Sequence, residues 1–277
     1  MFRYTKATLL REAFVWLAAL LSLLPFYFLV STALKPDEEL LTTTSSAPPG
    51  RPTVANFVDV LTASGQNNIL LSLINSALIT LGSIAGLVLF GSLAAYVLAR
   101  TARRWGSVAF YLFLIAIILP VQLGMIPLYI GARTLGLVGT PWGMIVLYVG
   151  MLMPLAVFLY AGFFRGLPRD YEEAAAIDGA SPGRVFARVV LPLMAPATGT
   201  VAILTGLIVW NDFFTALIFL GGSDYQTLPV SMYYYVGSLV SAWNKIFAIV
   251  ILSMIPILAF YLFAQKKFIQ GFAGGIK

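Results

Sequence analysis

Long apolar runs separated by short polar segments fill the sequence from end to end. Six of these runs are long enough to cross a bilayer, which takes roughly 20 helical residues. We expect helices over residues 12–34, 69–99, 108–129, 143–164, 189–219 and 246–264. The pattern therefore predicts an all-α integral membrane protein in which residues 1–277 form a single transmembrane domain.

The first apolar run follows Arg3, Lys6 and Arg11, and such a basic start also suits a secretory signal peptide. Ser31 and Ala33 could mimic the small residues of a cleavage site. The run is nevertheless long enough to span the membrane. We therefore expect a retained transmembrane helix.

Composition supports the assignment as a membrane protein and limits the kinds of chemical group that the chain can use. Hydrophobic residues make up 60% of the chain and charged residues only 10%, whereas soluble domains have about 25% charged residues. The chain has no cysteine and no histidine, so disulfides, thiolate metal sites and the usual near-neutral acid–base group are excluded. We expect no catalytic residue and no metal site.

Basic residues are distributed unevenly between the two sides of the membrane. Of 17 Lys and Arg residues, all but four fall at the N-terminus, in the segments after the second and fourth helices, or at the C-terminus. The four exceptions are Lys35, Arg51, Arg133 and Lys245. By the positive-inside rule, this predicts a multi-pass protein of a bacterial or archaeal cytoplasmic membrane with both termini in the cytoplasm. The formal charge of +6 then needs no nucleic-acid partner.

The longest polar interruption of the C-terminal half is residues 165–188, between the fourth and fifth apolar runs. Its acids favour a helix N-terminus near Pro168. Gly179 suits a left-handed C-cap, and Ser181 and Pro182 suit the N-cap and first residue of a second helix. The segment balances four bases against four acids: Arg165, Arg169, Arg184, Arg188, Asp170, Glu172, Glu173 and Asp178.

This segment carries a recognisable spacing. Glu173-Ala174-Ala175 is followed after three residues by Gly179, and then by Val189 and Leu191-Pro192. The spacing resembles the EAA loop of the permease subunits of binding-protein-dependent ABC importers, with valine in place of the usual isoleucine. In that family the short helix, called the coupling helix, docks in a cleft of the ATPase subunit. The resemblance implies ATPase-coupling roles for Glu172, Glu173, Ala174, Ala175, Asp178, Gly179 and Pro192.

The resemblance extends from about Asn75 to Lys277 and favours the carbohydrate-uptake branch. It implies a candidate translocation pathway at Asn75, Gln122, Trp210, Asn211 and Asp212, and a tail contact with the ATPase at Gln270 and Gly271. The residues themselves leave alternatives open, namely a proline kink near Gln122 and local helix capping by Asn211 or Asp212. A further set, which we expect to let helices pack closely, is Gly82, Ser83, Gly86, Gly91 and Ser92.

The chain resembles the maltose-type second permease subunit of a sugar importer, which works by alternating access. The resemblance implies a homologous permease partner in a heterodimer, two ATPase subunits, an extracytoplasmic solute-binding protein, a di- or oligosaccharide substrate and surrounding membrane lipid. ATP and Mg belong to the partner ATPase, because this chain lacks a phosphate-binding loop motif and needs no cofactor of its own.

Three alternatives remain at this stage. Glycerol phosphate or a polyol could replace the sugar, since similar permeases carry those solutes. An ATP-independent secondary transporter normally needs ionisable residues near the membrane midplane, and the six apolar cores have none. A membrane enzyme is disfavoured by the lack of His, Cys and any intramembrane carboxylate cluster.

Overall fold

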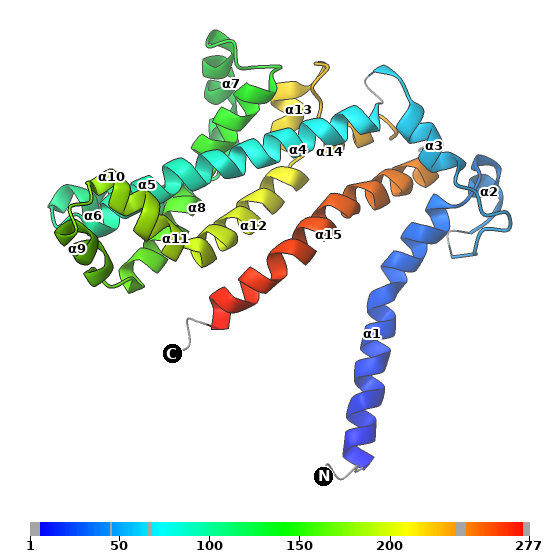
Figure 1. Ribbon diagram of the computed structural model, residues 1–277. Helices are drawn as coiled ribbons and strands as arrows, with labels where there is room; N and C mark the ends of the chain where they lie inside the picture. The colour runs from blue at the N-terminus through cyan, green and yellow to red at the C-terminus, as the bar shows by residue number, and fades with distance from the viewer. Residues whose placement is uncertain (1–5, 45, 66–67, 237–241, 274–277) are drawn as a thin grey trace. The chain divides into compact units, whose positions relative to one another are not determined.

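The computed structural model describes residues 6–44, 46–65, 68–236 and 242–273, and no strand occurs within these ranges (Figure 1). The predicted all-α class is confirmed. The helices are α1 Lys6–Ala33, α2 Asp37–Thr42, α3 Ala55–Thr62, α4 Ile69–Gly86, α5 Ser92–Arg100, α6 Arg104–Ile118, α7 Met125–Thr134, α8 Pro141–Gly166, α9 Asp170–Ile177, α10 Pro182–Val185, α11 Leu191–Leu193, α12 Ala195–Asn211, α13 Phe214–Leu220, α14 Leu228–Tyr233 and α15 Trp243–Ala273.

Three stretches of the described chain are long and apolar enough to cross a membrane as continuous helices, namely Thr8–Ala33, Ile69–Arg100 and Pro141–Gly166. Two bent pairs of helices raise this to as many as five spans. The sixth predicted run falls on α15, whose apolar part within the described residues, Trp243–Ala259, is shorter.

Helices α4 and α5 form one long element joined by a π-helical turn at Leu87–Gly91. The Ser92 hydroxyl donates to the carbonyl oxygens of Val88 and Leu89 within this turn. A serine hydroxyl that bonds carbonyls of the preceding turn offers them a partner besides the backbone N–H groups.

Small residues bring this long element close to α8, as the sequence predicted. A Cβ added at Gly82 would lie 2.5 Å from a side-chain carbon of Ile145, and one added at Gly86 would lie 2.5 Å from a side-chain carbon of Val149. The two helices therefore pack at a separation that larger residues at these positions would prevent.

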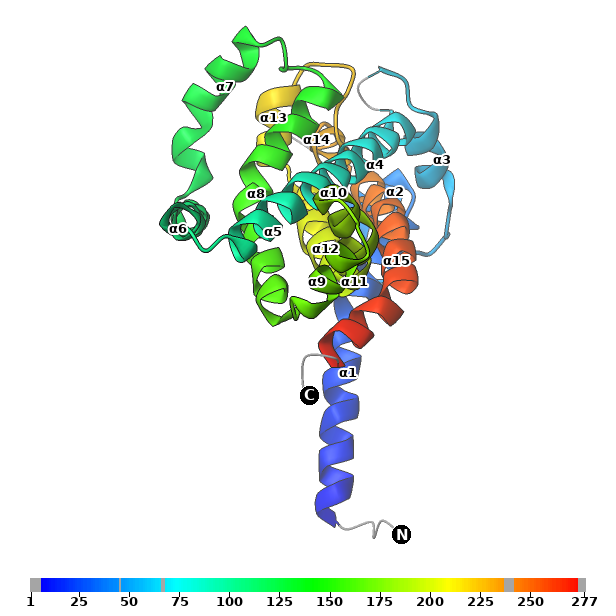
Figure 2. The same ribbon diagram turned by 60° about the vertical axis from the view of Figure 1, so that its left-hand side comes forward.

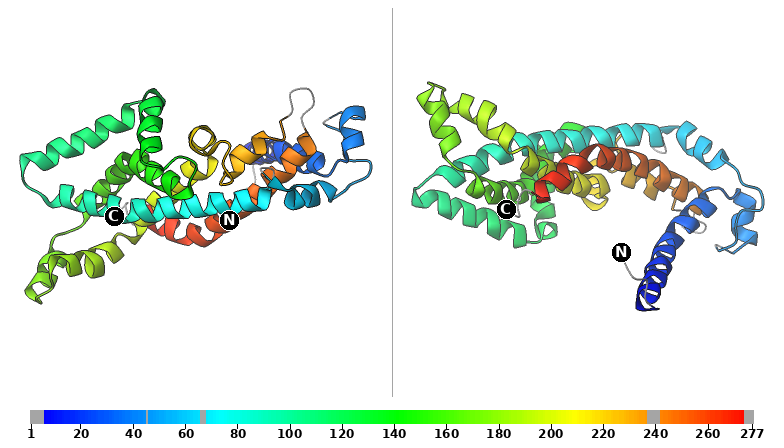
Figure 3. Two further views of the ribbon diagram at one scale, coloured as in Figure 1. Left: turned by 90° about the horizontal axis from the view of Figure 1, so that it is seen from above. Right: turned by 60° about the horizontal axis from the view of Figure 1, so that its bottom comes forward.

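The third predicted helix, residues 108–129, is not continuous. Helix α6 ends at Ile118, a 3-10 turn follows at Val121–Gly124, and α7 leaves at an angle of 94° (Figure 3, left). Pro120 explains the break, because proline lacks an N–H and forces the preceding residue out of the helical region. The chain is therefore kinked near Gln122, and the predicted helix 108–129 is two helices joined by a bend.

The fifth predicted helix, residues 189–219, is also interrupted. The chain from Pro182 to Leu193 includes a π-helical turn at Phe186–Val190 and meets α12 at a bend of 74°. Pro196 lies in the first turn of α12, where its missing N–H removes a link to the preceding helix. A second break at Asp212 separates α12 from α13.

The chain divides into two compact units, residues 1–70 with 231–256 and residues 71–230 with 257–277. In the first unit, the Asn244 amide donates to the carbonyl of Lys35 at 3.1 Å, the carboxylate of Asp37 at 2.7 Å and the side-chain oxygen of Asn56 at 2.9 Å. The Asn56 amide donates in turn to the carbonyls of Ala33 and Lys35, both at 2.8 Å. These bonds satisfy carbonyls freed where α1 ends.

The second unit has two apolar cores that share α8. One core surrounds Tyr160 and Phe164 near the end of α8 and includes Phe186 and Val190. The other surrounds the start of α8 and includes residues of α7, α12 and α13. Both ends of α8 are therefore fixed by packing, and its last turn leads directly into the polar segment at residues 165–188.

Candidate functional site

Helix α9 ends as the sequence predicts. Gly179 has φ of +78°, in the left-handed region that favours glycine. Its N–H donates to the carbonyl of Ala176 at 3.0 Å, and the N–H of Ala180 donates to the carbonyl of Ala175 at 3.0 Å. This pair of bonds is a Schellman motif, and it turns the chain sharply toward α10.

The start of α9 and the start of α10 also follow local rules. Arg169 is the N-cap of α9, and its carbonyl accepts from the N–H groups of Glu172 and Glu173 at 2.8 and 3.0 Å. Helix α9 begins at Asp170, slightly later than expected from Pro168. Ser181 and Pro182 occupy the predicted N-cap and first position of α10, although no bond from the Ser181 side chain caps that helix.

The two faces of α9 have different surroundings. Glu172 and Ala175 are half-buried, and Ala175 packs against the apolar core around Tyr160. Glu173, Ala174 and Ile177 are exposed on the opposite face, and Ile177 is 86% exposed. Ile177 therefore places a large apolar side chain at the solvent-facing surface of α9, beside the Glu173 carboxylate.

The Glu172 carboxylate is held by α5. Arg100 contacts one of its oxygens through Nη2 at 2.6 Å and Nε at 2.8 Å, and the Tyr96 hydroxyl donates to the other at 2.8 Å. Arg100 Nη2 also donates to the carbonyl of Leu167 at 3.0 Å. Only about 15% of either charged side chain is exposed. Glu172, one of the residues expected to couple to the ATPase, therefore directs its carboxylate into this chain.

Aromatic packing surrounds this ion pair. The Tyr96 ring lies 5.6 Å from that of Phe164 at the end of α8 and 5.2 Å from that of Phe186 in the π-helical turn after α10. Figures 1 and 2 show α9 and α10 beside the end of α5 in the second unit. The tyrosine thus links three elements, and its hydroxyl reaches the fourth, α9.

Three of the five pathway candidates form hydrogen bonds, and the first of them, Asn75, does so together with its neighbour Ser76. The Asn75 amide donates to the carbonyl of Gln226 at 3.3 Å, and the Ser76 hydroxyl accepts from the N–H of Leu228 at 2.8 Å. Residues 226–228 are buried, although they fall between the fifth and sixth predicted helices. The Asn75-Ser76 pair in an apolar run was the available signal, but its partner lies 151 residues away along the chain.

The second candidate is Asp212, which behaves as a local cap. Its carboxylate accepts from the Tyr148 hydroxyl at 2.8 Å and from the N–H of Thr215 in α13 at 3.3 Å. Asn211 is exposed and its amide bonds the carbonyl of Leu207, within the same helix, at 2.8 Å. These contacts are the local ones that the capping alternative expects, and a pathway role for Asn211 or Asp212 stays a prediction.

The remaining candidates are scattered. Trp210 is 9% exposed, whereas Gln122 is exposed in the 3-10 turn between α6 and α7. Gln270 and Gly271 lie in the last turn of α15, and residues 274–277 lie outside the described chain. Among the five pathway candidates, no hydrogen bond joins any two within the described residues. No group of three or more acidic, His or Cys residues suited to a metal was found in those ranges either.

Comparisons with known proteins agree on one family. Residues 79–273 match the family described as binding-protein-dependent transport system inner membrane component. The chain is 35% identical over 253 residues to the melibiose/raffinose/stachyose import permease protein MelC of Bacillus subtilis, covering 91% of this chain and 90% of that protein. It is 30% identical to the galactooligosaccharides transport system permease protein GanQ of the same species, covering 94% and 92%.

A solved structure supports the fold. A chain of a bacterial ABC transporter involved in the import of the acidic polysaccharide alginate superposes with a TM-score of 0.81. The match covers 96% of this chain and 99% of that one, at 21% sequence identity.

Proposed function

Because the chain belongs to the family of binding-protein-dependent transport system inner membrane components, we propose that it is a permease subunit that moves a di- or oligosaccharide by ATP-driven alternating access. Two relatives at 30% identity or more are named for transport of oligosaccharides, which supports the substrate class. A homologous permease, two ATPase subunits that bind ATP and Mg, and an external solute-binding protein would complete the importer.

The observation that carries this proposal is the two-sided arrangement of α9. Glu172 fastens the inner face to α5, while Glu173, Ala174 and Ile177 remain exposed on the outer face. We infer that the outer face docks on the ATPase and that Glu173 meets a basic group there. Glu172 then acts as a positioning residue, since its carboxylate is engaged within this chain.

The same contacts connect α9 to the membrane helices, so a movement of α9 would be transmitted to them. Helix α5 continues through the π-helical turn into α4, so residues 69–100 form one element that is long and apolar enough to span the bilayer. A displacement of α9 would pass through the ion pair of Glu172 with Arg100 to this element, and through Phe186 to α12. Both routes use packed side chains that resist independent motion.

Uptake measured with and without the ATPase tests the proposal. The chain is co-produced with its importer partners, reconstituted in liposomes, and supplied with labelled raffinose and the binding protein. We expect uptake that needs ATP hydrolysis and disappears when the ATPase is left out or replaced by a hydrolysis-deficient variant. Uptake that continues without the ATPase would contradict the proposal and favour a secondary transporter.

A further inference from the structure

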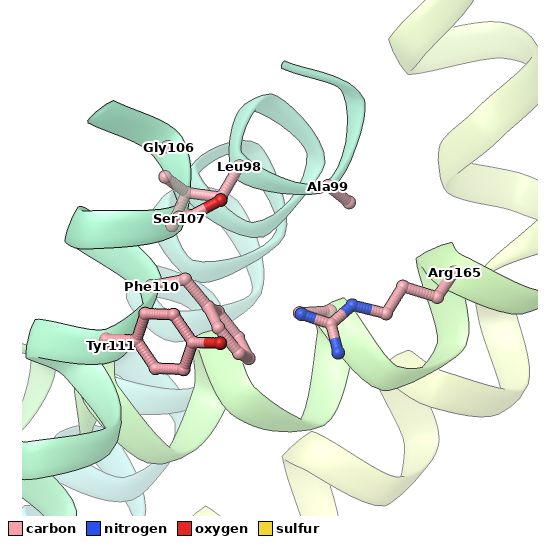
Figure 4. Close-up of a pocket in the computed structure, with 8 residues that line it drawn as sticks. Leu98, Ala99, Gly106, Ser107, Phe110, Tyr111 and Arg165 are labelled. Atoms are coloured by element: carbon pink, nitrogen blue, oxygen red, sulfur yellow. The ribbon is translucent and has the colours of Figure 1, made fainter. Parts of the chain in front are cut away.

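Three helix ends meet at a small hollow away from the outer face of α9. Helix α5 ends at Arg100, α6 begins at Arg104 and α8 ends at Gly166. The hollow has a volume of about 80 Å³. Its lining includes Leu98 and Ala99 from α5, Ser107, Phe110 and Tyr111 from α6, and Arg165 from α8 (Figure 4).

Three hydrogen-bond donors line this hollow. The guanidinium carbon of Arg165 lies 4.6 Å from the centre of the Phe110 ring, and Figure 4 shows the side chain reaching from α8 toward Phe110 and Tyr111. A cation on an aromatic face is held in place by the ring while its N–H groups remain able to donate. Within the described chain, neither Arg165 nor the hydroxyls of Ser107 and Tyr111 form a hydrogen bond or an ion pair.

The charge around the hollow favours an anion. Arg103 and Arg104 stand exposed at the start of α6, and no carboxylate of the described chain pairs with either of them. Arg100 is different, because Glu172 already neutralises it. An arginine and two hydroxyls that line one hollow, with two further arginines at the start of α6, match the oxygens of a phosphate group.

The surface beside the hollow indicates where this phosphate comes from. Val108, Tyr111, Leu112 and Ile115 are each more than half exposed and follow one face of α6 at helical spacing. This apolar face begins at the hollow and continues along a helix of the membrane-embedded part. A ligand with a phosphate head and acyl chains would place its head in the hollow and its chains along this face.

We propose that this hollow is a binding site for the headgroup of an anionic phospholipid. Arg165 provides the charge, Ser107 and Tyr111 provide hydroxyl donors, and the exposed face of α6 accommodates the acyl chains. The inference rests only on the position of the chain in a bilayer, and transport is not needed for it to hold. The lipid site can therefore be disproved while the proposed function stands, and the proposed function can be disproved while the lipid site stands.

Native mass spectrometry of the delipidated full chain in detergent tests this site. The probes are phosphatidylglycerol, phosphatidylcholine and inorganic phosphate, added separately to wild type, Arg165→Gln and Tyr111→Phe. We expect wild type to prefer phosphatidylglycerol to phosphatidylcholine, and Arg165→Gln to weaken phosphatidylglycerol binding about tenfold or more, as expected for a charge-assisted bond. Tyr111→Phe keeps the ring and should weaken binding less.

The matched control is Arg133→Gln, which removes an exposed arginine of α7 that does not line the hollow. It should bind phosphatidylglycerol as wild type does. Equal binding of the two lipids, or unchanged binding in Arg165→Gln, would overturn the proposal. So would displacement of the lipid by low millimolar phosphate, since the site would then serve a soluble anion.

Discussion

The guanidinium of Arg100 is joined to the carboxylate of Glu172 through contacts of 2.6 and 2.8 Å, across 72 residues of sequence. Largely buried ion pairs often contribute little net stability, because desolvation of both charges offsets their attraction. They do fix geometry, since loss of either partner leaves the other charge without compensation. We therefore regard this pair as the device that sets the position of α9 on α5.

A double-mutant cycle measures this relationship. Arg100→Ala leaves the Glu172 carboxylate with the Tyr96 hydroxyl alone, and we expect a loss of about 3 kcal/mol in the stability of the second unit. The double variant Arg100→Ala with Glu172→Ala should lose less than the sum of the two single variants. Thermal unfolding of the purified chain provides the readout. Additive losses would show that the two side chains do not act together.

Exposed Ile177 provides a test of the docking surface. Burial of an isoleucine side chain is worth about 1.5 to 3 kcal/mol, so Ile177→Ser should weaken association with the ATPase subunit by about tenfold or more. Co-purification of the ATPase with the permease measures this. Ile177→Leu is the control, because it keeps the apolar volume. Equal recovery of the ATPase with Ile177→Ser and with wild type would place the interface elsewhere.

Two glycines in membrane helices give a matched pair for the packing of α4 on α8. Gly86→Ala would place a Cβ 2.5 Å from Val149, so we expect a loss of about 1 to 3 kcal/mol. Gly150→Ala meets no atom within 4 Å and should be neutral or stabilising by about 0.5 to 1 kcal/mol. Thermal stability of the two purified variants is compared. The same response from both would contradict the close approach of the helices.

Topology can be tested on a background without native cysteine. Leu135 and Ala102 are both exposed, and the positive-inside rule places them on opposite sides of the membrane. In whole cells, Leu135→Cys should react with an impermeant thiol reagent, whereas Ala102→Cys should react only after permeabilisation. Reaction of the cysteine at position 102 in intact cells would reverse the predicted orientation.

The sequence was sufficient to predict those features that depend only on neighbouring residues along the chain. The positive φ of Gly179 and the helix start at Ser181-Pro182 follow from the conformational limits of glycine and proline. A proline kink in this region was one of the alternatives that the sequence left open, but the angle of the break at Pro120 depends on the packing of α7. Local rules reach only a few residues in either direction, which is why these features were readable and their spatial consequences were not.

The candidate site was less predictable, because it depends on which way a helix faces. Glu172 and Glu173 are adjacent, so they point about 100° apart on α9, and both satisfy the rule that acids suit a helix N-terminus. Only the packing of α9 on α5 decides that Glu172 meets Arg100. The contact of Asn75 with the segment before α14 is equally long-range. Pairings of this kind leave no periodic signal in one sequence.

The most direct measurement compares Glu173→Ala with Glu172→Ala in the reconstituted importer. Both ATP hydrolysis stimulated by the loaded binding protein and uptake per ATP are recorded. Loss of a carboxylate that pairs with a buried basic group across an interface costs about 2 to 5 kcal/mol. Glu173→Ala should therefore lose assembly or stimulated hydrolysis, whereas Glu172→Ala should keep the ATPase bound and lower the uptake per ATP. Near-normal stimulation and uptake in Glu173→Ala, in a complex that still assembles, would contradict the account.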